Sequence, residues 1–298
     1  MRAISPIIDR LLQGAIDFHV HASPDPVERR RLDALEVARQ AKEARMRAVV
    51  IKNHHYSTAP LACTINPVVP GFSLIGSIVL NSAVGGLNPE AVEIAVRMMA
   101  RVIWMPTYSS VVDTERRLKN MTSIPLTKKA MANKGISLLD KNGELVQEVI
   151  SILEITKEAN AVLSTGHVSI PEVYALGEAA HDLDIKLTIT HPLNEKYGSR
   201  LTLRQQLELA SKGALMEHCF LDFMPPPYGE LEIRVLAEYI LSIGAEHCIL
   251  CTDLGQYQNP TPLEGFRMML AELLKVGISE AELGVMVKTN PARILSLE

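Results

Sequence analysis

Short apolar segments that alternate with segments of helical period constrain the fold of this chain more than any other feature. Apolar, β-branched segments occur at residues 15–22, 47–55, 72–80, 101–108, 161–167, 186–192, 214–220 and 247–253. Helices are expected near Leu32–Glu43, Pro89–Met99, Leu145–Ala159, Pro171–Leu183, Leu203–Gly213 and Glu230–Ile243. Strands that are apolar at nearly every position are typical of a parallel sheet that is covered on both faces.

This repeat predicts an α/β fold, a (β/α)8 barrel that forms a single domain over residues 1–298. A chain of 298 residues with 47% hydrophobic content can bury one large core, and about eight strand–helix units suit a closed barrel. A doubly wound open sheet is the alternative. No glycine-rich dinucleotide fingerprint follows the first expected strand, which counts against that alternative.

One stretch after the fourth expected strand breaks the rhythm. Residues 109–146 open with a polar, partly basic portion that is expected to form a long βα loop. Such a loop suits a lid, an interface or a mobile surface segment. The end of the stretch predicts a β-hairpin with Asn142 and Gly143 at its turn.

Charge and cysteine content limit the kinds of partner and compartment. Thirty Lys and Arg residues stand against 34 Asp and Glu residues, so neither nucleic acid nor an anionic membrane is expected as a partner. No secretory signal opens the chain, and no apolar run approaches the roughly 20 residues of a membrane span. Strand alternation separates Cys248 from Cys251, which argues against a shared metal or disulfide there. We expect a reduced, cytoplasmic protein with a small-molecule substrate, and a homo-oligomer is left open.

Histidines gather at the ends of the expected strands. In chain order, the residues at these ends are His19 and His21, His54 and His55, His167, His191, and finally Asp253. The carboxyl ends of barrel strands meet at one face, where active sites form. A lone histidine there would more often be structural, but a set at equivalent positions predicts a site for a divalent metal.

The His19-Val20-His21 segment has a geometry that suits a metal. Residues two apart on a strand point to the same face, about 6–7 Å apart, while Val20 points outward. Closure of the barrel would bring Asp253, on the last strand, beside the first. Nitrogen and oxygen ligands without a thiolate suit zinc, with manganese, iron or nickel as alternatives.

The order of these residues resembles that of the amidohydrolase superfamily of metal-dependent hydrolases, of the amidohydrolase-2 type. The hallmarks are HxH after strand one, single histidines after strands five and six, and aspartate after strand eight. The resemblance implies that His19, His21 and His167 bind metal. It implies that His191 binds a metal or polarises the substrate, and that Asp253 binds metal and acts as the general base.

The chain departs from this resemblance at the fourth expected strand. Many members carry a carboxylated lysine or a glutamate there, which bridges two metals, whereas VIWMPTY offers neither. One ion is therefore expected rather than two. Lys52, on the second strand, is an unusual candidate, because a buried lysine can become nucleophilic or carboxylated. A lysine paired with a neighbouring carboxylate is the alternative.

Further polar residues near the strand ends are candidates for substrate binding: Lys52, Asn53, His54, His55, Tyr108 and Arg200. Alternation lets at most one of His54 and His55 face the pocket, and likewise only one of Glu217 and His218. Arg200 could hold a carboxylate or phosphate through its forked guanidinium, or be an ordinary loop arginine.

The resulting function is hydrolysis of an amide, lactone or other ester, in which Asp253 and His191 are catalytic. A decarboxylase of the same superfamily is the alternative. A metal-binding barrel without catalysis is a third possibility. The polymerase-and-histidinol-phosphatase fold also opens with HxH, but it usually needs more His and Asp motifs than this chain shows.

Overall fold

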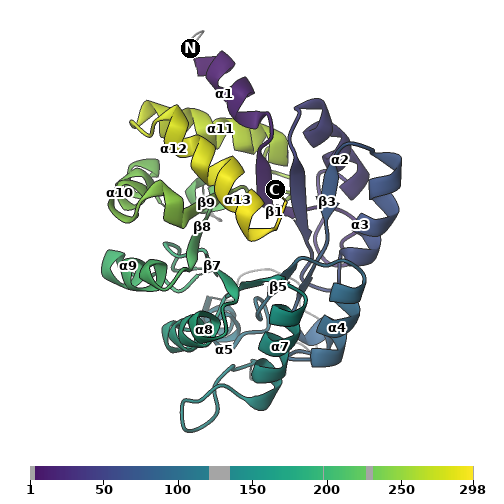
Figure 1. Cartoon of the computed structure of the whole chain (residues 1–298), viewed down its shortest axis with the longest axis vertical. Coiled ribbons are helices and arrows are strands. Elements are labelled where there is room, and N and C mark those ends of the chain that lie inside the picture. Colours follow the sequence, from purple (N-terminus) through teal and green to yellow (C-terminus); the bar gives the residue numbers. More distant parts are fainter. Residues whose placement is uncertain (1–3, 121–134, 197, 226–230, 298) are drawn as a thin grey trace.

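The chain folds as parallel sheets surrounded by helices, as the sequence predicts (Figure 1). The computed structural model describes residues 4–120, 135–196, 198–225 and 231–297. The strands are β1 (Ile16–His21), β2 (Ala48–Lys52), β3 (Ser73–Ile75), β4 (Ser77–Val79), β5 (Val102–Trp104), β6 (Val162–Ser164), β7 (Lys186–Thr190), β8 (Leu215–Cys219) and β9 (Cys248–Cys251). One sheet has the order β1-β2-β3 and the other runs from β4 to β9 in sequence order. The α/β class with parallel sheets is therefore confirmed.

Helices separate most of the strands along the chain. They are α1 (Ile4–Leu12), α2 (Ala34–Glu43), α3 (Ala59–Ile65), α4 (Pro89–Arg97), α5 (Val111–Asn120), α7 (Gln147–Glu158), α8 (Ile170–Asp182), α9 (Leu203–Ser211), α10 (Ile233–Ile243), α11 (Pro262–Lys275), α12 (Glu280–Gly284) and α13 (Asn290–Ile294). Short helical turns are η1 (Asn66–Val68), η2 (Ser82–Val84), η3 (Phe220–Phe223), η4 (Ala245–His247) and η5 (Val285–Thr289). The six expected helices are found within a few residues of their predicted bounds. No helix in the described ranges is both long enough and apolar enough to cross a bilayer.

The stretch expected as a long loop after the fourth strand is partly helical. Its first portion forms α5, which Ser110 caps by accepting a hydrogen bond at Oγ from the backbone N–H of Asp113 (3.1 Å). Residues 121–134 lie outside the described ranges. The expected hairpin is reduced to a single antiparallel bridge between Leu139 and Leu145, closed by the turn at Asp140.

The single strand expected at residues 72–80 is divided at Gly76. β3 pairs with β2, whereas β4 pairs with β5, so Gly76 lies where the pairing changes partner. A Cβ atom at Gly76 would collide with the backbone of Ala59 at the start of α3. The close approach of α3 explains why this position has no side chain.

The first and last strands lie side by side. The backbone N–H of His21 donates to the carbonyl of Leu254 (2.8 Å), and that of Asp253 donates to the carbonyl of His19 (2.8 Å). Val20 and Leu254 form a parallel bridge between these bonds. The carboxyl ends of β1 and β9 are thereby held together, which is the arrangement that the predicted site requires.

The two faces of the strands belong to different cores. Val20 and Cys248 pack in the large core between strands and helices, whereas Phe18, Cys219 and Cys251 belong to a smaller core on the opposite face. We call this smaller cluster the inner core; Ile294 at the end of α13 and Leu295, which follows it, also belong to it. The prediction that Cys248 and Cys251 point to opposite faces is confirmed.

Candidate metal centre

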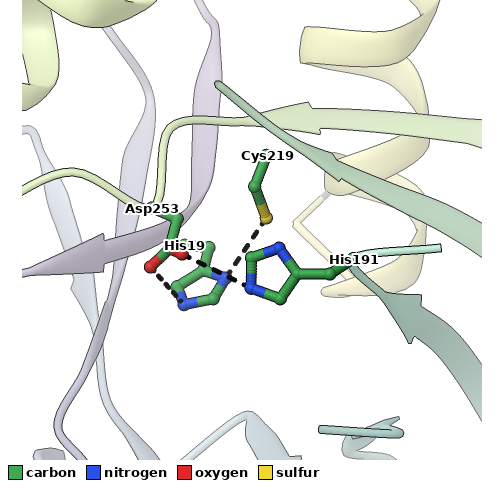
Figure 2. A group of neighbouring side chains, drawn as sticks. All are labelled: His19, His191, Cys219 and Asp253. Carbon is green, nitrogen blue, oxygen red and sulfur yellow. Dashed lines mark hydrogen bonds and ion pairs between the residues drawn. The ribbon is translucent and has the colours of Figure 1, made fainter. Parts of the chain in front are cut away.

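Three imidazole rings surround one carboxylate at the carboxyl ends of the strands. Asp253 Oδ1 lies 3.1 Å from His19 Nε2 and 2.9 Å from His21 Nε2, and Asp253 Oδ2 lies 3.4 Å from His191 Nε2. All four residues are buried. Figure 2 shows Asp253 beside the ring of His19, with His191 next to that ring and the sulfur of Cys219 pointing toward it. The structure thus brings together four of the five residues that were predicted to bind metal.

Unusual backbone conformations aim two of these side chains. His191 and Asp253 follow the ends of their strands in the left-handed region, with φ of 50° and 54°. Left-handed conformations cost a non-glycine residue about 1–2 kcal/mol and often occur at functional sites. Close packing continues at Gly255, where a Cβ atom would collide with the carbonyl of His21. The backbone therefore changes direction at His191 and at Asp253, the two residues whose side chains meet in this cluster.

Glu217 on β8 orients the ring of His19. His19 Nδ1 lies 2.7 Å from Glu217 Oε1, and the hydroxyls of Thr188 and Thr190 donate to Glu217 Oε2, each at 3.2 Å. Burial favours a higher pKa for Glu217, but the bond and charge of His19 lower it below its usual value. A carboxylate behind a ligand imidazole fixes its tautomer and orientation. Alternation predicted that one of residues 217 and 218 faces inward, although not this role.

Asp222 holds His191 in the same way. His191 Nδ1 lies 3.1 Å from the Asp222 carboxylate, which also accepts a hydrogen bond from Asn194 Nδ2 (2.6 Å). Burial would lower the pKa of His191, but the charge of Asp222 raises it. Asp222 lies in η3, where no strand period predicts its direction, so sequence reasoning missed it.

His167, the fifth predicted ligand, lies at the edge of this group. Its ring centroid is 5.5 Å from that of His191, and its Nδ1 faces Asp113 Oδ2 at 3.6 Å. Burial lowers the pKa of His167 to about 4. Asp113 in turn pairs with Arg117 (2.9 Å), one turn further along α5. These partners come from the segment that was expected to be a loop, where no pattern of residues predicts them.

A column of stacked groups forms the other side of the site. The His21 and His54 ring centroids are 4.8 Å apart, and those of His54 and Tyr108 are 3.8 Å apart. The guanidinium carbon of Arg117 lies 3.9 Å from the centroid of Tyr108. The hydroxyl of Tyr108 donates to Glu28 Oε1 (3.0 Å). We call His54, Tyr108 and Arg117, which continue this stack beyond His21, the stacked column.

The other predicted substrate-binding residues differ in their positions. His54 is buried and His55 only half-buried, so one of this pair faces inward, as alternation requires. Asn53 is buried and accepts a hydrogen bond from the N–H of His55 (2.8 Å). Arg200 is exposed, with 66% of its side chain accessible, and pairs with Glu195 on the surface. The structure does not bring Arg200 to the cluster around Asp253.

Lys52 is the most isolated charge near the centre. It is 1% exposed, and Nζ has no hydrogen-bond partner among the described residues. Nζ lies 5.0 Å from the ring centroid of Trp104. Burial lowers the pKa of Lys52, while the charges of Asp253 and Glu217 oppose that shift. The expected alternative of a paired lysine is not what the described residues show.

The donor set suits a divalent transition metal. Donor atoms of His19, His191, Cys219 and Asp253 all lie within 4.8 Å of one another. His19 Nε2 faces Asp253 without the alignment of a hydrogen bond, as atoms that share a cation do. Burial would raise the pKa of Asp253, but the charge of His19 and the contacts with His19 and His21 hold it well below its usual range. Imidazole nitrogens around an ionised carboxylate are the ligands that zinc and similar metals prefer.

Solved structures show the same fold. A crystal structure of an amidohydrolase from Pseudomonas aeruginosa matches with a TM-score of 0.63 at 12% identity over 98% of both chains. A putative 2-pyrone-4,6-dicarboxylic acid hydrolase from Pseudomonas putida matches with a TM-score of 0.60 at 12% identity, over 96% of this chain and 98% of that one. A 2,6-dihydroxybenzoate decarboxylase from Rhizobium matches with a TM-score of 0.59 at 10% identity, over 96% and 99%. The resemblance to amidohydrolase-2 enzymes is thus confirmed at the level of the fold.

The sequence comparisons give a family without an activity. No curated protein matches the chain significantly. A family model described as a family of unknown function, DUF6282, matches residues 14–217. That range contains the two histidines of β1 and Glu217 but ends before Asp253. The chain belongs to the DUF6282 family.

Proposed function

We propose that this chain is a metal-dependent hydrolase that cleaves an amide, lactone or other ester of a small molecule. The observation that carries the proposal is the convergence of His19, His21 and His191 on the carboxylate of Asp253. The fold similarity to hydrolases of the amidohydrolase type supports it. Buried imidazoles around an ionised carboxylate at strand ends have no purely structural need, because apolar residues would pack there at lower cost.

The metal would be held by His19, His21, His191 and Asp253, with His167 as a further ligand, and zinc is the proposed ion. When bound there, a divalent cation supplies Lewis acidity, which lowers the pKa of a coordinated water molecule. Manganese, iron and nickel accept the same donors. One ion at these residues is proposed, because β5 supplies neither a lysine nor a glutamate to bridge two.

Asp253 is the proposed general base. Its carboxylate is ionised, because neighbouring imidazoles hold its pKa well below the usual range. It can therefore accept a proton from water and return it to the leaving group. His191 faces the same carboxylate through Nε2, while Asp222 fixes its other nitrogen, so the ring is oriented to stabilise negative charge on an attacked carbonyl.

Substrate contacts are proposed for the groups on the other side of the site. His54 and Tyr108 present stacked rings, and Asn53 and His55 follow directly from β2. Lys52 would attract a carboxylate, because its buried Nζ has no partner among the described residues. This last observation also favours a second candidate reaction, decarboxylation, in which the bound carboxylate leaves as carbon dioxide. Hydrolysis incorporates water into the product, so isotope-labelled water distinguishes the two.

We further propose that the strands close into a single-domain (β/α)8 barrel over residues 1–298. The pairing of β1 with the end of β9 supports closure on one side. On the other side, only Gly76 separates β3 from β4, so the two sheets share one interrupted strand. A cytoplasmic location is also proposed, because Cys63, Cys219, Cys248 and Cys251 are all free thiols.

Elemental analysis tests the metal site directly. Tag-free protein should carry a transition metal, of which the double variant His21→Ala/His191→Ala should lose about one equivalent. His181→Ala on the exposed surface of α8 is the matched control and should retain the metal. If the wild-type protein binds no metal even after reconstitution, the proposal of a metal-dependent hydrolase is wrong.

A further inference from the structure

Two thiols lie next to the candidate metal centre, in the inner core. Glu217 and Cys219 are two residues apart on β8, so their side chains share a face. Cys251 ends β9 and is the direct parallel partner of Cys219. His19 reaches the same point from β1, which lies beside β9. Three neighbouring strands therefore deliver two sulfur, one oxygen and one nitrogen donor to one place.

The distances among these four donors are those of a coordination shell. Cys219 Sγ lies 3.4 Å from Cys251 Sγ, 3.8 Å from Glu217 Oε1 and 3.7 Å from His19 Nδ1. Cys251 Sγ lies 3.9 Å from Glu217 Oε1, and His19 Nδ1 lies 2.7 Å from it. A tetrahedral zinc ion with Zn–S bonds of about 2.3 Å and Zn–N or Zn–O bonds of about 2.1 Å separates its donors by roughly 3.4–3.8 Å. The His19–Glu217 pair would need to move apart, and the two sulfurs by a smaller amount.

We propose that Glu217, Cys219 and Cys251, with His19 Nδ1 as fourth donor, form a second cation site that takes a thiophilic divalent metal. Thiolates select zinc, cobalt and softer ions, and this site offers two of them, whereas the group around Asp253 includes one sulfur, that of Cys219. Binding releases the two thiol protons to solvent, and His19 also gives up its ring N–H proton when both of its nitrogens bind metal. The two sites share the ring of His19, whose Nε2 faces Asp253 and whose Nδ1 faces Glu217.

The surroundings of the thiols fit a structural role for this ion. All four side chains are buried, and together they would fill the four positions of a tetrahedral ion, which leaves none for a substrate. Closed sites of this kind stabilise the fold rather than perform chemistry. An ion there would tie β1, β8 and β9 together and fix the ring of His19. The inference therefore does not depend on which reaction the outer site performs.

Lys52 is the nearest group that opposes the binding of a cation here. Its charge interacts with Glu217, Cys219 and Cys251 as well as with Asp253. However, its Nζ makes no hydrogen bond among the described residues, so it does not occupy the donor atoms. Lys52→Met removes this positive charge and is expected to tighten the binding of cobalt to the thiols.

Cobalt substitution tests the second site, because a cobalt ion bound to thiolates shows thiolate-to-cobalt charge-transfer absorption and only this site contains both cysteines. Protein produced in cobalt-supplemented medium should show this band, and X-ray absorption at the cobalt edge should detect two sulfur neighbours. The band should vanish in Cys219→Ser/Cys251→Ser. It should persist in Cys248→Ser, the matched control on the opposite face of β9.

His21→Ala separates this inference from the proposed function. His21 contacts Asp253 but is not one of the four donors, so the variant should lose metal from the outer site and keep the charge-transfer band. Cobalt without sulfur neighbours in the wild-type protein would overturn the second site, whatever the outer site does. That measurement needs no variant, so poor folding of the serine variants cannot obscure the result.

Discussion

On one side of the site, His19, His21 and Asp253 project from β1 and from the end of β9, and backbone hydrogen bonds between those strands hold them in place. On the other side, His54 and Tyr108 stack in a column that begins beside β2 and ends on α5. Hydrogen bonds of the sheet hold the strand side in place. The stacked column is held by side-chain contacts, which end at Arg117 on α5. This difference predicts that the strand side sets the chemistry, while the column sets which substrate is accepted.

Asp253→Asn, on the strand side, should have the largest effect of these variants on activity. We expect turnover of an ester or lactone substrate to fall by about 10²–10⁴-fold, because the amide cannot accept the proton from water. The melting temperature should not fall. Asp182→Asn, at the exposed end of α8, is the matched control. Turnover that survived in Asp253→Asn would remove the general base from the strand side.

Asp222→Asn should have the next largest effect. Replacement of the carboxylate removes the charged partner of His191 Nδ1, so the imidazole loses its fixed orientation. We expect the outer site to bind zinc roughly 10–100-fold more weakly, as measured by competition with a chelator. Glu195→Gln, on an exposed carboxylate, should bind zinc as the wild type does. Unchanged affinity in Asp222→Asn would show that the sheet alone orients the ring.

Tyr108→Ala should affect substrate binding and leave the metal in place. Loss of the ring opens the stacked column between His54 and Arg117, which we expect to raise KM by about threefold to tenfold. Tyr108→Phe keeps the stacking but loses the hydrogen bond to Glu28. Its KM should therefore lie between the KM of the wild type and that of Tyr108→Ala. Loss of bound metal in Tyr108→Ala would contradict the separation of the two sides.

The smallest effect concerns the stability of the metal-free protein against pH. Burial lowers the pKa of His167 from 6.5 to about 4, so unfolded chains bind a proton between these values that folded chains do not. Stability should therefore fall as the pH falls through this range. The pKa of His191 is raised, so its contribution is present below 6.5 and is lost as the pH rises through the raised value.

Melting curves of two variants test these opposite slopes. His167→Asn should flatten the loss of stability on the acid side, and His191→Asn should flatten the loss on the alkaline side. Differences of several degrees in melting temperature are expected. Identical pH profiles for the wild type and both variants would show that these two residues do not titrate differently on folding.

The strand side was largely predictable from the sequence, because strand period decides which way each side chain points. His19 and His21 share a face and Val20 does not, and Cys248 and Cys251 separate, as alternation requires. Register was not predictable. Only the pairing of β8 with β9 places Cys219 opposite Cys251, and no feature of either segment alone reveals that pairing.

The partners that come from loops and turns could not be predicted. Asp222 lies in η3, and Asp113 and Arg117 lie on α5, whose polar composition concealed its helical character. Directions of side chains in such segments depend on tertiary packing rather than on a period. The sequence therefore indicates which histidines gather at the strand ends. It does not indicate which carboxylates lie beside the Nδ1 atoms of His167 and His191.

The left-handed backbone of His191 and Asp253 has a consequence for the evolution of this chain. Glycine adopts that conformation without steric conflict, but it would leave the partners of either side chain buried and unpaired: Asp222 without His191, and His19 and His21 without Asp253. The residues that would relieve the backbone are therefore the ones that the buried charges do not allow. Replacement of either residue is open only to side chains that keep a polar group at the same point.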